Sequence, residues 1–299
     1  MNNLVKLEGV SKYFGKHTAL EHVDLTIQNG ETVGFLGPNG SGKSTTIRVM
    51  LGLLKKSGGE VELFGKDAWT GAVDIHKRVA YVPGDVNVWP NLTGGQVIDV
   101  LGKLHGKFNE EKRQQLIERF QLDPRKKSKT YSKGNRQKLA LITAFASEAD
   151  LYIFDEPTSG LDPLMASIFR ECVRELRQEG KAVLLSSHIL AEVEELCDRV
   201  SIIKEGKIIE SGTLEELRHL TRISITAETK ETVASLAERS DVHQWKADGS
   251  KVHFYVDAEG LAPVMQELSA AGVVSLESRP PTLEEIFLRH YESKAGEAG

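Results

Sequence analysis

The chain has 299 residues, of which 40% are hydrophobic and 27% are charged, and its formal net charge is −5. This length predicts one large domain, or one large and one small domain, of ordinary globular composition. The acidic balance argues against nucleic acid as the main partner, because the overall charge does not attract a phosphate backbone. Cys172 and Cys197 lack the spacing of a metal site or a disulfide framework, which is typical of free thiols in a reducing compartment.

The sequence shows no targeting or membrane-spanning segment. Residues 1–6 lack an apolar signal core, and no apolar run approaches the roughly 20 residues that a spanning helix needs. We therefore expect a cytosolic chain that reaches a membrane only through a partner.

Strands and helices alternate through the first two thirds of the chain. Apolar runs bounded by turn residues predict β-strands at residues 4–7, 19–27, 32–36, 151–154, 182–186, 200–204 and 207–210. Amphipathic spacing predicts helices at about residues 43–54, 93–104, 110–120, 134–147, 164–178 and 189–197. This order indicates an α/β fold with a mainly parallel sheet and helices on both faces.

The pattern changes from about Arg222 onward, where a β-α-β-β-α-β unit indicates a small α+β domain. Its strands are predicted at residues 223–227, 242–246, 251–256 and 273–277, and its helices at 231–239, 261–271 and 282–291. We expect Asp248-Gly249 to turn the central hairpin. Residues 293–299 are small and polar and are expected to fray.

A glycine-rich run follows the predicted strand at residues 32–36 and opens a helix. It reads Gly37-Pro38-Asn39-Gly40-Ser41-Gly42-Lys43-Ser44-Thr45 and fits the P-loop pattern. Glycines let successive N–H groups point inward toward phosphate oxygens, while Lys43 reaches the β- and γ-phosphates and Ser44 binds Mg²⁺. The alternative, a glycine-rich surface turn, is weakened by the flanking strand and helix.

Two acidic residues follow the buried strand at residues 151–154. Asp155 is placed to hold Mg²⁺ through water, and Glu156 to polarise the attacking water as a general base. The alternative is that Asp155 caps the turn before Pro157. His188, which ends the next strand, is a candidate to contact the γ-phosphate, although a lone histidine is more often structural.

These segments together resemble the ATP-binding subunit of an ABC transporter over about residues 4–220. The further matches are the signature Ser132-Lys133-Gly134-Asn135 after Tyr131, and the D-loop at residues 159–162. The resemblance implies a P-loop cassette with an antiparallel β part and a helical subdomain at about residues 90–147. It also implies ATP and Mg²⁺, with Lys43, Glu156 and His188 catalytic. Phe14 matches the aromatic that stacks on adenine, with a buried strand aromatic as the alternative.

In this family two subunits enclose two ATP molecules head to tail. The resemblance therefore implies a homodimer, with Ser132, Gly134 and Asn135 of one copy facing ATP held by the other. Gly84 stands where the family carries a glutamine that reaches Mg²⁺, and Asp85 is the candidate to replace it as a ligand. With Lys133 and Asn135 in a signature that commonly has Gly and Gln, we predict reduced or differently coupled hydrolysis.

The resemblance further implies an integral membrane permease as partner, which places the chain at the cytoplasmic face of the membrane. The permease's coupling helix is received at residues 86–93, where Trp89 is an interface anchor or a core residue. Residues 221–292 resemble the accessory domain of drug- and lipid-exporter cassettes, with the terminal motif at residues 281–288, so we expect export.

The competing hypothesis is a soluble ABC-type ATPase that acts as a regulatory or nucleic-acid-associated switch. Such relatives carry tandem cassettes or a long coiled-coil insertion, and neither is visible in this sequence. A GTPase switch is disfavoured because the sequence lacks an Asn-Lys-x-Asp guanine-reading motif.

Overall fold

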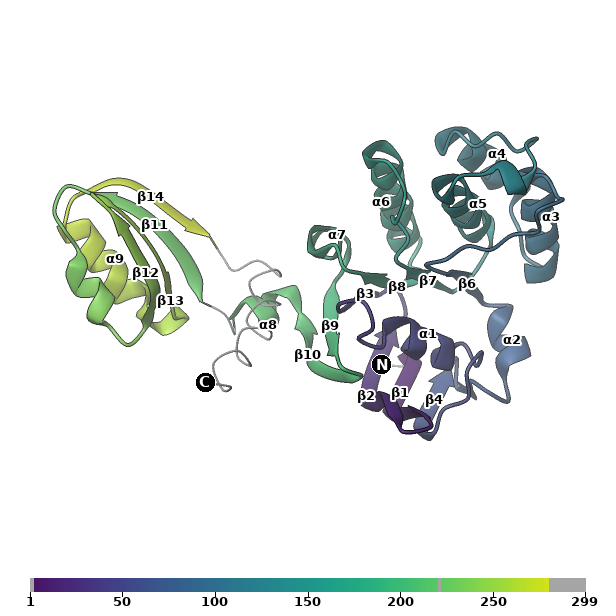
Figure 1. Ribbon diagram of the computed structural model, residues 1–299, viewed down its shortest axis with the longest axis horizontal. Helices are drawn as coiled ribbons and strands as arrows, with labels where there is room; N and C mark the ends of the chain where they lie inside the picture. The colour runs from purple at the N-terminus through teal and green to yellow at the C-terminus, as the bar shows by residue number, and fades with distance from the viewer. Residues whose placement is uncertain (1–2, 220–221, 280–299) are drawn as a thin grey trace. The chain divides into compact units, whose positions relative to one another are not determined.

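The computed structural model describes residues 3–219 and 222–279. Contacts divide the chain into two compact units, Met1–Ser211 and Gly212–Gly299 (Figure 1). The domain boundary near residue 220 stays a prediction. The predicted helix at 282–291, the motif at 281–288 and the tail at 293–299 lie outside the described residues.

An antiparallel sheet opens the N-terminal unit, with strand order β2-β1-β4-β5. Its strands are β1 (Asn3–Phe14), β2 (His17–Gln28), β4 (Gly58–Leu63) and β5 (Lys66–Asp67). The sequence reading missed β4, because two glycines begin it and acidic residues alternate with its apolar ones. Hydrogen bonding to β1 stabilises this segment as a strand, although its local sequence does not predict one.

A six-stranded sheet forms the centre of this unit, in the order β10-β9-β3-β8-β7-β6. The strands are β3 (Thr32–Leu36), β6 (Val79–Val82), β7 (Leu151–Asp155), β8 (Ala182–Ser187), β9 (Arg199–Lys204) and β10 (Lys207–Thr213). The pairs β9–β3, β3–β8, β8–β7 and β7–β6 are all parallel. The expectation of a mainly parallel sheet is confirmed, and β3, β7 and β8 are buried throughout.

Helices cover both faces of this sheet. On one side α1 (Lys43–Met50) packs against the sheet, and on the other lie α5 (Lys133–Ala146), α6 (Pro163–Gln178) and α7 (Leu190–Leu196) (Figure 1). Strand β7 contributes side chains to the core on both faces of the sheet. Ile153 joins the core that contains Ile47, whereas Phe154 faces the opposite way. There Phe154 packs on Phe145 and Phe169, with each centroid distance 5.2 Å.

The helical part of the unit consists of α3 (Gly94–His105), α4 (Glu110–Arg119), a short 3₁₀ helix at Ser128–Thr130, and α5. A separate short helix, α2 (Ala72–His76), precedes β6. Thr93, with Gln96 three residues later, has the spacing of a capping box, and the structure contains one. Thr93 Oγ1 accepts from the Gln96 N–H, and Gln96 Oε1 accepts from the Thr93 N–H.

The C-terminal unit includes α8 (Leu214–His219) and one antiparallel sheet in the order β12-β13-β11-β14. Its strands are β11 (Ile223–Thr229), β12 (Val242–Asp248), β13 (Lys251–Val256) and β14 (Val273–Arg279). Helix α9 (Leu261–Ala270), after a 3₁₀ turn at Ala258–Gly260, covers one face around the fully buried Phe254 and Leu268.

The predicted helix at residues 231–239 is wrong. The structure has only a 3₁₀ helix, Ala234–Glu238. The N–H groups of Lys230 and Glu231 donate to the carbonyls of Gly272 and Ala271, which fixes the start of this segment to the turn after α9. These bonds take the place of the first turn of the predicted helix, so tertiary contacts override a favourable helix propensity.

Candidate nucleotide-binding site

The P-loop connects the end of β3 to the start of α1, as the sequence predicts. Gly42 occupies the N-cap position with φ of 114°, a backbone conformation that a residue with a side chain rarely adopts. Because Gly42 has no side chain that caps α1, the first N–H groups of the helix face the loop. Those donors and the positive end of the helix dipole favour an anion at this point.

The Lys43 side chain folds back into this loop and is only 6% exposed. Its ammonium donates to the carbonyl oxygens of Gly37 at 2.5 Å and Pro38 at 3.2 Å. The same nitrogen lies 3.2 Å from Glu156 Oε1. The P-loop lysine and the predicted general base therefore form one buried ion pair.

Strand order explains why distant residues meet here. In the sheet β3, β8 and β7 are neighbours and parallel, so their carboxyl ends lie at one edge. Lys43 follows β3, His188 follows β8, and Glu156 follows β7. His188 Nδ1 contacts Glu156 Oε2, and the His188 side chain is 58% exposed. The structure thus brings all three predicted catalytic residues together, with the histidine open to a ligand.

Glu156 has φ of 52°, in the left-handed region that non-glycine residues rarely enter. Its N–H donates to Ser186 O at 3.0 Å, which holds the turn after β7 against β8. Such a backbone persists where surrounding contacts determine it, and it is common at functional sites. Here it directs the carboxylate to Lys43 and His188.

Asp155 is 3% exposed and accepts a hydrogen bond from Ser186 Oγ at 2.5 Å. Burial, with a smaller contribution from the charge of Asp155, raises the pKa of Tyr81 to about 12, and Arg48 opposes this shift. The assignment of Asp155 to Mg²⁺ stays a prediction, as does its alternative role as a cap before Pro157.

The residues present fit a magnesium ion. Among the described residues no group of three or more His, Cys, Asp or Glu side chains forms a ready-made metal cage. Mg²⁺ usually binds through one or two carboxylates and completes its shell with water and phosphate oxygens, so such a cage is not required. Ser41 Oγ, in the P-loop, is buried without a hydrogen-bond partner in the described part of the chain, which leaves a polar oxygen for a bound ligand.

The signature residues form a second group with the D-loop. Ser132 caps α5, because its Oγ accepts from the Asn135 N–H at 3.2 Å. A Cβ at Gly134 would lie 2.5 Å from Gly160 O, so only glycine permits this approach of two backbones. Lys133 Nζ donates to Ser159 Oγ at 2.9 Å. This departure from the common signature therefore connects α5 to the D-loop.

Three predicted residues lie outside both groups. Phe14 is 49% exposed at the end of β1, and Trp89 is also 49% exposed, so the buried alternatives for both are wrong. Asp85 is exposed. Gly84 lies against β7, since a Cβ there would be 3.2 Å from Asp155 O. The assignment of Asp85 to Mg²⁺ stays a prediction.

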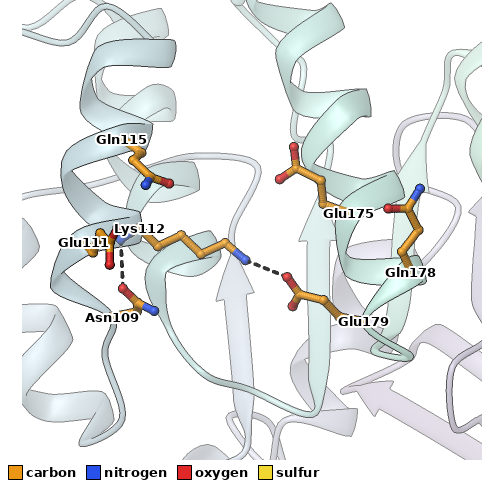
Figure 2. Close-up of a pocket in the computed structure, with 7 residues that line it drawn as sticks. All are labelled: Asn109, Glu111, Lys112, Gln115, Glu175, Gln178 and Glu179. Atoms are coloured by element: carbon orange, nitrogen blue, oxygen red, sulfur yellow. Dashed lines mark hydrogen bonds and ion pairs between the residues drawn. The ribbon is translucent and has the colours of Figure 1, made fainter.

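A cleft of about 480 Å³ lies between α4 and α6, away from this chemistry (Figure 2). It is polar and open, and Lys112 Nζ crosses it to Glu179 Oε1 at 3.2 Å. No P-loop or signature residue lines it, so this cleft is not the nucleotide site.

Family models match two segments of the chain. The ABC transporter model matches residues 20–159, and the model for the C-terminal domain of DrrA1-3-like ATP-binding proteins matches residues 212–291. Nod factor export ATP-binding protein I of Cupriavidus metallidurans is 31% identical, over 97% of this chain and 97% of the relative. The linearmycin resistance ATP-binding protein LnrL of Bacillus subtilis is 30% identical, over 95% and 97%.

The chain belongs to the ATP-binding subunits of ABC transporters. A solved dimeric ATP-binding cassette in a post-hydrolysis state, bound to ADP and Pi, matches with a TM-score of 0.64 at 26% identity, over 70% of this chain and 98% of the other. An ABC ATP-binding subunit is an ATPase, which agrees with the P-loop and the acidic pair after β7. None of the relatives named above supports the nucleic-acid switch.

Within residues 3–219 and 222–279 this ABC subunit has no helix with the length and apolarity that crossing a bilayer requires.

Sequence reasoning missed one buried acid near the site, Glu192 of α7, which is 5% exposed. The sequence places this acidic residue in the short helix predicted directly after His188, but the local pattern does not show that its side chain is buried.

Proposed function

We propose that two copies of this ABC subunit bind two ATP molecules head to tail and hydrolyse them to power export through a separate permease. The contact that supports this most strongly is the Lys43–Glu156–His188 arrangement, with 3.2 Å between the lysine nitrogen and the glutamate oxygen. Lys43 neutralises the terminal phosphates, Glu156 takes the proton of the attacking water, and His188 holds that carboxylate in orientation.

The P-loop run supplies the rest of the first half-site: Gly37, Pro38, Asn39, Gly40, Ser41, Gly42, Ser44 and Thr45. Asp155 and Ser44 are the residues that hold Mg²⁺, which when bound neutralises developing phosphate charge. Phe14, exposed at the end of β1, stacks on the adenine.

The second half-site comes from the other copy. Ser132, Gly134 and Asn135 lie at the start of α5, where helix amides and a hydroxyl favour a phosphate. Within one chain this group contacts the D-loop. A second copy is needed to bring it to the phosphates held by Lys43, so dimerisation and hydrolysis are coupled.

A groove of about 280 Å³ supports docking of the permease on this unit. It is mainly apolar and runs between β6 and the helices α3 and α5, and its walls include Val79, Pro83, Val86, Val88, Leu101 and Leu139. The exposed Trp89 follows Val88 directly. A short amphipathic helix of a membrane protein suits this surface, because its apolar side can enter the groove. Such docking places the subunit at the cytoplasmic face of the membrane.

We assign residues 1–220 to the cassette, with a helical subdomain at about 90–147, and residues 221–292 to an accessory domain. Export is supported by the named relatives, one of which is an export protein and one a resistance protein. Gly84 gives no side chain to the metal, so turnover is slower than in a glutamine-bearing subunit, and Asp85 is the substitute ligand.

Replacing Glu156 with Gln tests the proposed reaction. We expect ATP hydrolysis by the full chain to fall about 10²–10⁴-fold, because a general base contributes that much. ATP binding is retained, and ATP shifts the variant to a dimer in size-exclusion chromatography. Glu179→Gln, in the cleft of Figure 2, is the matched control and keeps the parental rate. Parental hydrolysis by Glu156→Gln contradicts the assignment.

A further inference from the structure

Glu192 of α7 is a buried carboxylate that the proposed reaction does not use. It is 5% exposed, and burial raises its pKa above the ordinary range against the opposing effect of two hydroxyl hydrogen bonds. A buried carboxylate is costly unless it is hydrogen-bonded, and an apolar side chain would fill the same space at less cost. The hydrogen bonds that it accepts therefore indicate what it does.

Both hydrogen bonds end on the same oxygen, Glu192 Oε2. Thr158 Oγ1 donates to it at 3.1 Å, and Ser187 Oγ donates to it at 3.4 Å. The Ser187 hydroxyl also accepts from the Ile189 N–H at 2.9 Å, which fixes its proton toward Glu192. One acceptor thus joins a hydroxyl from the segment after β7 to a hydroxyl at the end of β8.

The segment after β7 carries Glu156 and the end of β8 leads to His188, and the proposed reaction requires these two side chains to be in contact. Thr158 comes two residues after Glu156, and Ser187 comes immediately before His188. The backbone bond from the Glu156 N–H to Ser186 O connects the same two segments on the sheet side. Glu192 connects them again, two residues after Glu156 on one segment and one residue after Ser186 on the other, so the backbone bond and the Glu192 contacts together restrict the separation of Glu156 and His188.

We propose that Glu192 is a positioning residue for ATP hydrolysis, which acts by holding Thr158 and Ser187 on one carboxylate oxygen. This inference rests on the proposed roles of Glu156 and His188. Small displacements of a catalytic group reduce rate much more than binding, because binding is spread over the P-loop whereas proton transfer needs one distance. The turnover number therefore depends on Glu192, and the KM for ATP does not.

The test compares two replacements of Glu192 in the full chain. Glu192→Gln keeps an oxygen acceptor and removes the charge, whereas Glu192→Leu removes both. We expect kcat to fall about 10–100-fold in Glu192→Leu with KM changed less than about 2-fold, and to stay within about 3-fold of parental in Glu192→Gln. Glu171→Gln, on the neighbouring helix α6, is the control, because Glu171 pairs with Arg119 at 3.3 Å outside the hydroxyl bonds.

Thr158→Val and Ser187→Ala keep the measurement informative if Glu192→Leu does not fold, since each removes one hydroxyl and leaves the carboxylate. Each is expected to lower kcat about 3–10-fold, and the double variant Thr158→Val/Ser187→Ala to approach Glu192→Leu, because all act through one oxygen. The proposal is overturned if these hydroxyl variants hydrolyse ATP at the parental rate. It is equally overturned if Glu192→Gln is as impaired as Glu192→Leu.

Glu156→Gln is measured beside these variants to separate the two proposals. If it retains parental hydrolysis, the base assignment fails whatever Glu192 does. If it is inactive while Glu192→Leu turns over normally, only the positioning proposal fails.

Discussion

The two compact units use their sheets in different ways. In the six-stranded sheet β3, β8 and β7 are parallel, so the segments that follow them place Lys43, His188 and Glu156 at one edge. In the C-terminal sheet the paired strands are antiparallel, so neighbouring carboxyl ends lie at opposite edges. Parallel pairing thus collects polar residues that antiparallel pairing separates.

The charged groups of the two units differ accordingly. Lys43 is 6% exposed against Glu156, where a low dielectric strengthens its interaction with phosphate. Arg239, in the C-terminal unit, pairs with Asp241 at 2.7 Å and Glu267 at 2.9 Å with all three partly exposed. Arg222 and His243 both contact Asp257. These surface pairs stabilise local structure weakly and carry no arrangement for chemistry.

Lys43→Ala gives the largest expected effect. Removal of the buried cation lowers ATP turnover about 10³-fold, equivalent to about 4 kcal/mol, because charge that develops on the phosphate loses a preorganised partner. Steady-state hydrolysis and ATP binding by the full chain are the measurements. Lys112→Ala, at the exposed pair of Figure 2, is the control and keeps the parental rate. Equal losses of ATP turnover in Lys43→Ala and Lys112→Ala would show that the buried cation has no special role in hydrolysis.

Phe254→Ala tests whether the C-terminal unit is stabilised by its own core. Phe254 is fully buried and stacks on Trp245 at a centroid distance of 5.1 Å, so its loss costs about 3 kcal/mol. We expect a lower unfolding midpoint by urea, monitored by the Trp245 fluorescence in a background in which Trp69 and Trp89 are replaced by Phe, and an unchanged Kd for ATP. Lys246→Ala, an exposed change on β12, is the control. A weakened ATP affinity in Phe254→Ala would contradict the division of roles between the units.

Asp257 makes the stability of the C-terminal unit depend on pH in the acidic range. Burial acts to raise its pKa, but hydrogen bonds from His243 and Arg222 outweigh this and lower it. A folded-state pKa below the unfolded value means that the stabilisation is present above the unfolded pKa of about 4 and is lost as pH falls below it.

The measurement is the melting temperature of the full chain and of Asp257→Asn at pH 7 and pH 3. At pH 7 we expect the parental C-terminal unit to melt roughly 2–5 °C higher than the variant, as exposed pairs of about 0.2–1 kcal/mol predict. The gap narrows at pH 3, because part of the Asp257 population is then protonated. A gap of unchanged size in acid would show that the pairing of Asp257 is not its cause.

Arg119→Ala has the smallest expected effect. Arg119 of α4 pairs with Glu171 at 3.3 Å and Glu175 at 2.9 Å on α6, beside the cleft of Figure 2. Since these charges are partly exposed, their loss costs less than about 1 kcal/mol in urea unfolding and leaves ATP hydrolysis unchanged. A large loss of turnover would mean that this cleft takes part in the reaction.

Local sequence determined the loops, helix starts and strands whose conformation depends mainly on neighbouring residues. The P-loop pattern located the turn between β3 and α1, because only a run of glycines permits backbone such as that of Gly42. Thr93 and Gln96 marked the start of α3, and apolar runs located β3, β7 and β8, since strands buried on both faces need no alternation. The strands predicted at residues 200–204 and 207–210 leave only Glu205 and Gly206 for the turn between them, and both have positive φ, 49° and 78°.

Tertiary structure decided everything that depends on which strands are neighbours. Strand β4 forms because β1 offers a partner, and residues 230–231 bond to the turn after α9 in place of an α-helix. The left-handed backbone of Glu156 and its contacts with Lys43 and His188 need β3, β8 and β7 side by side. Glu192 shows the same limit, because its hydroxyl partners lie on separate segments of the chain. The sequence determined the nucleotide-binding elements, and the parallel order of three strands determined that they form one site.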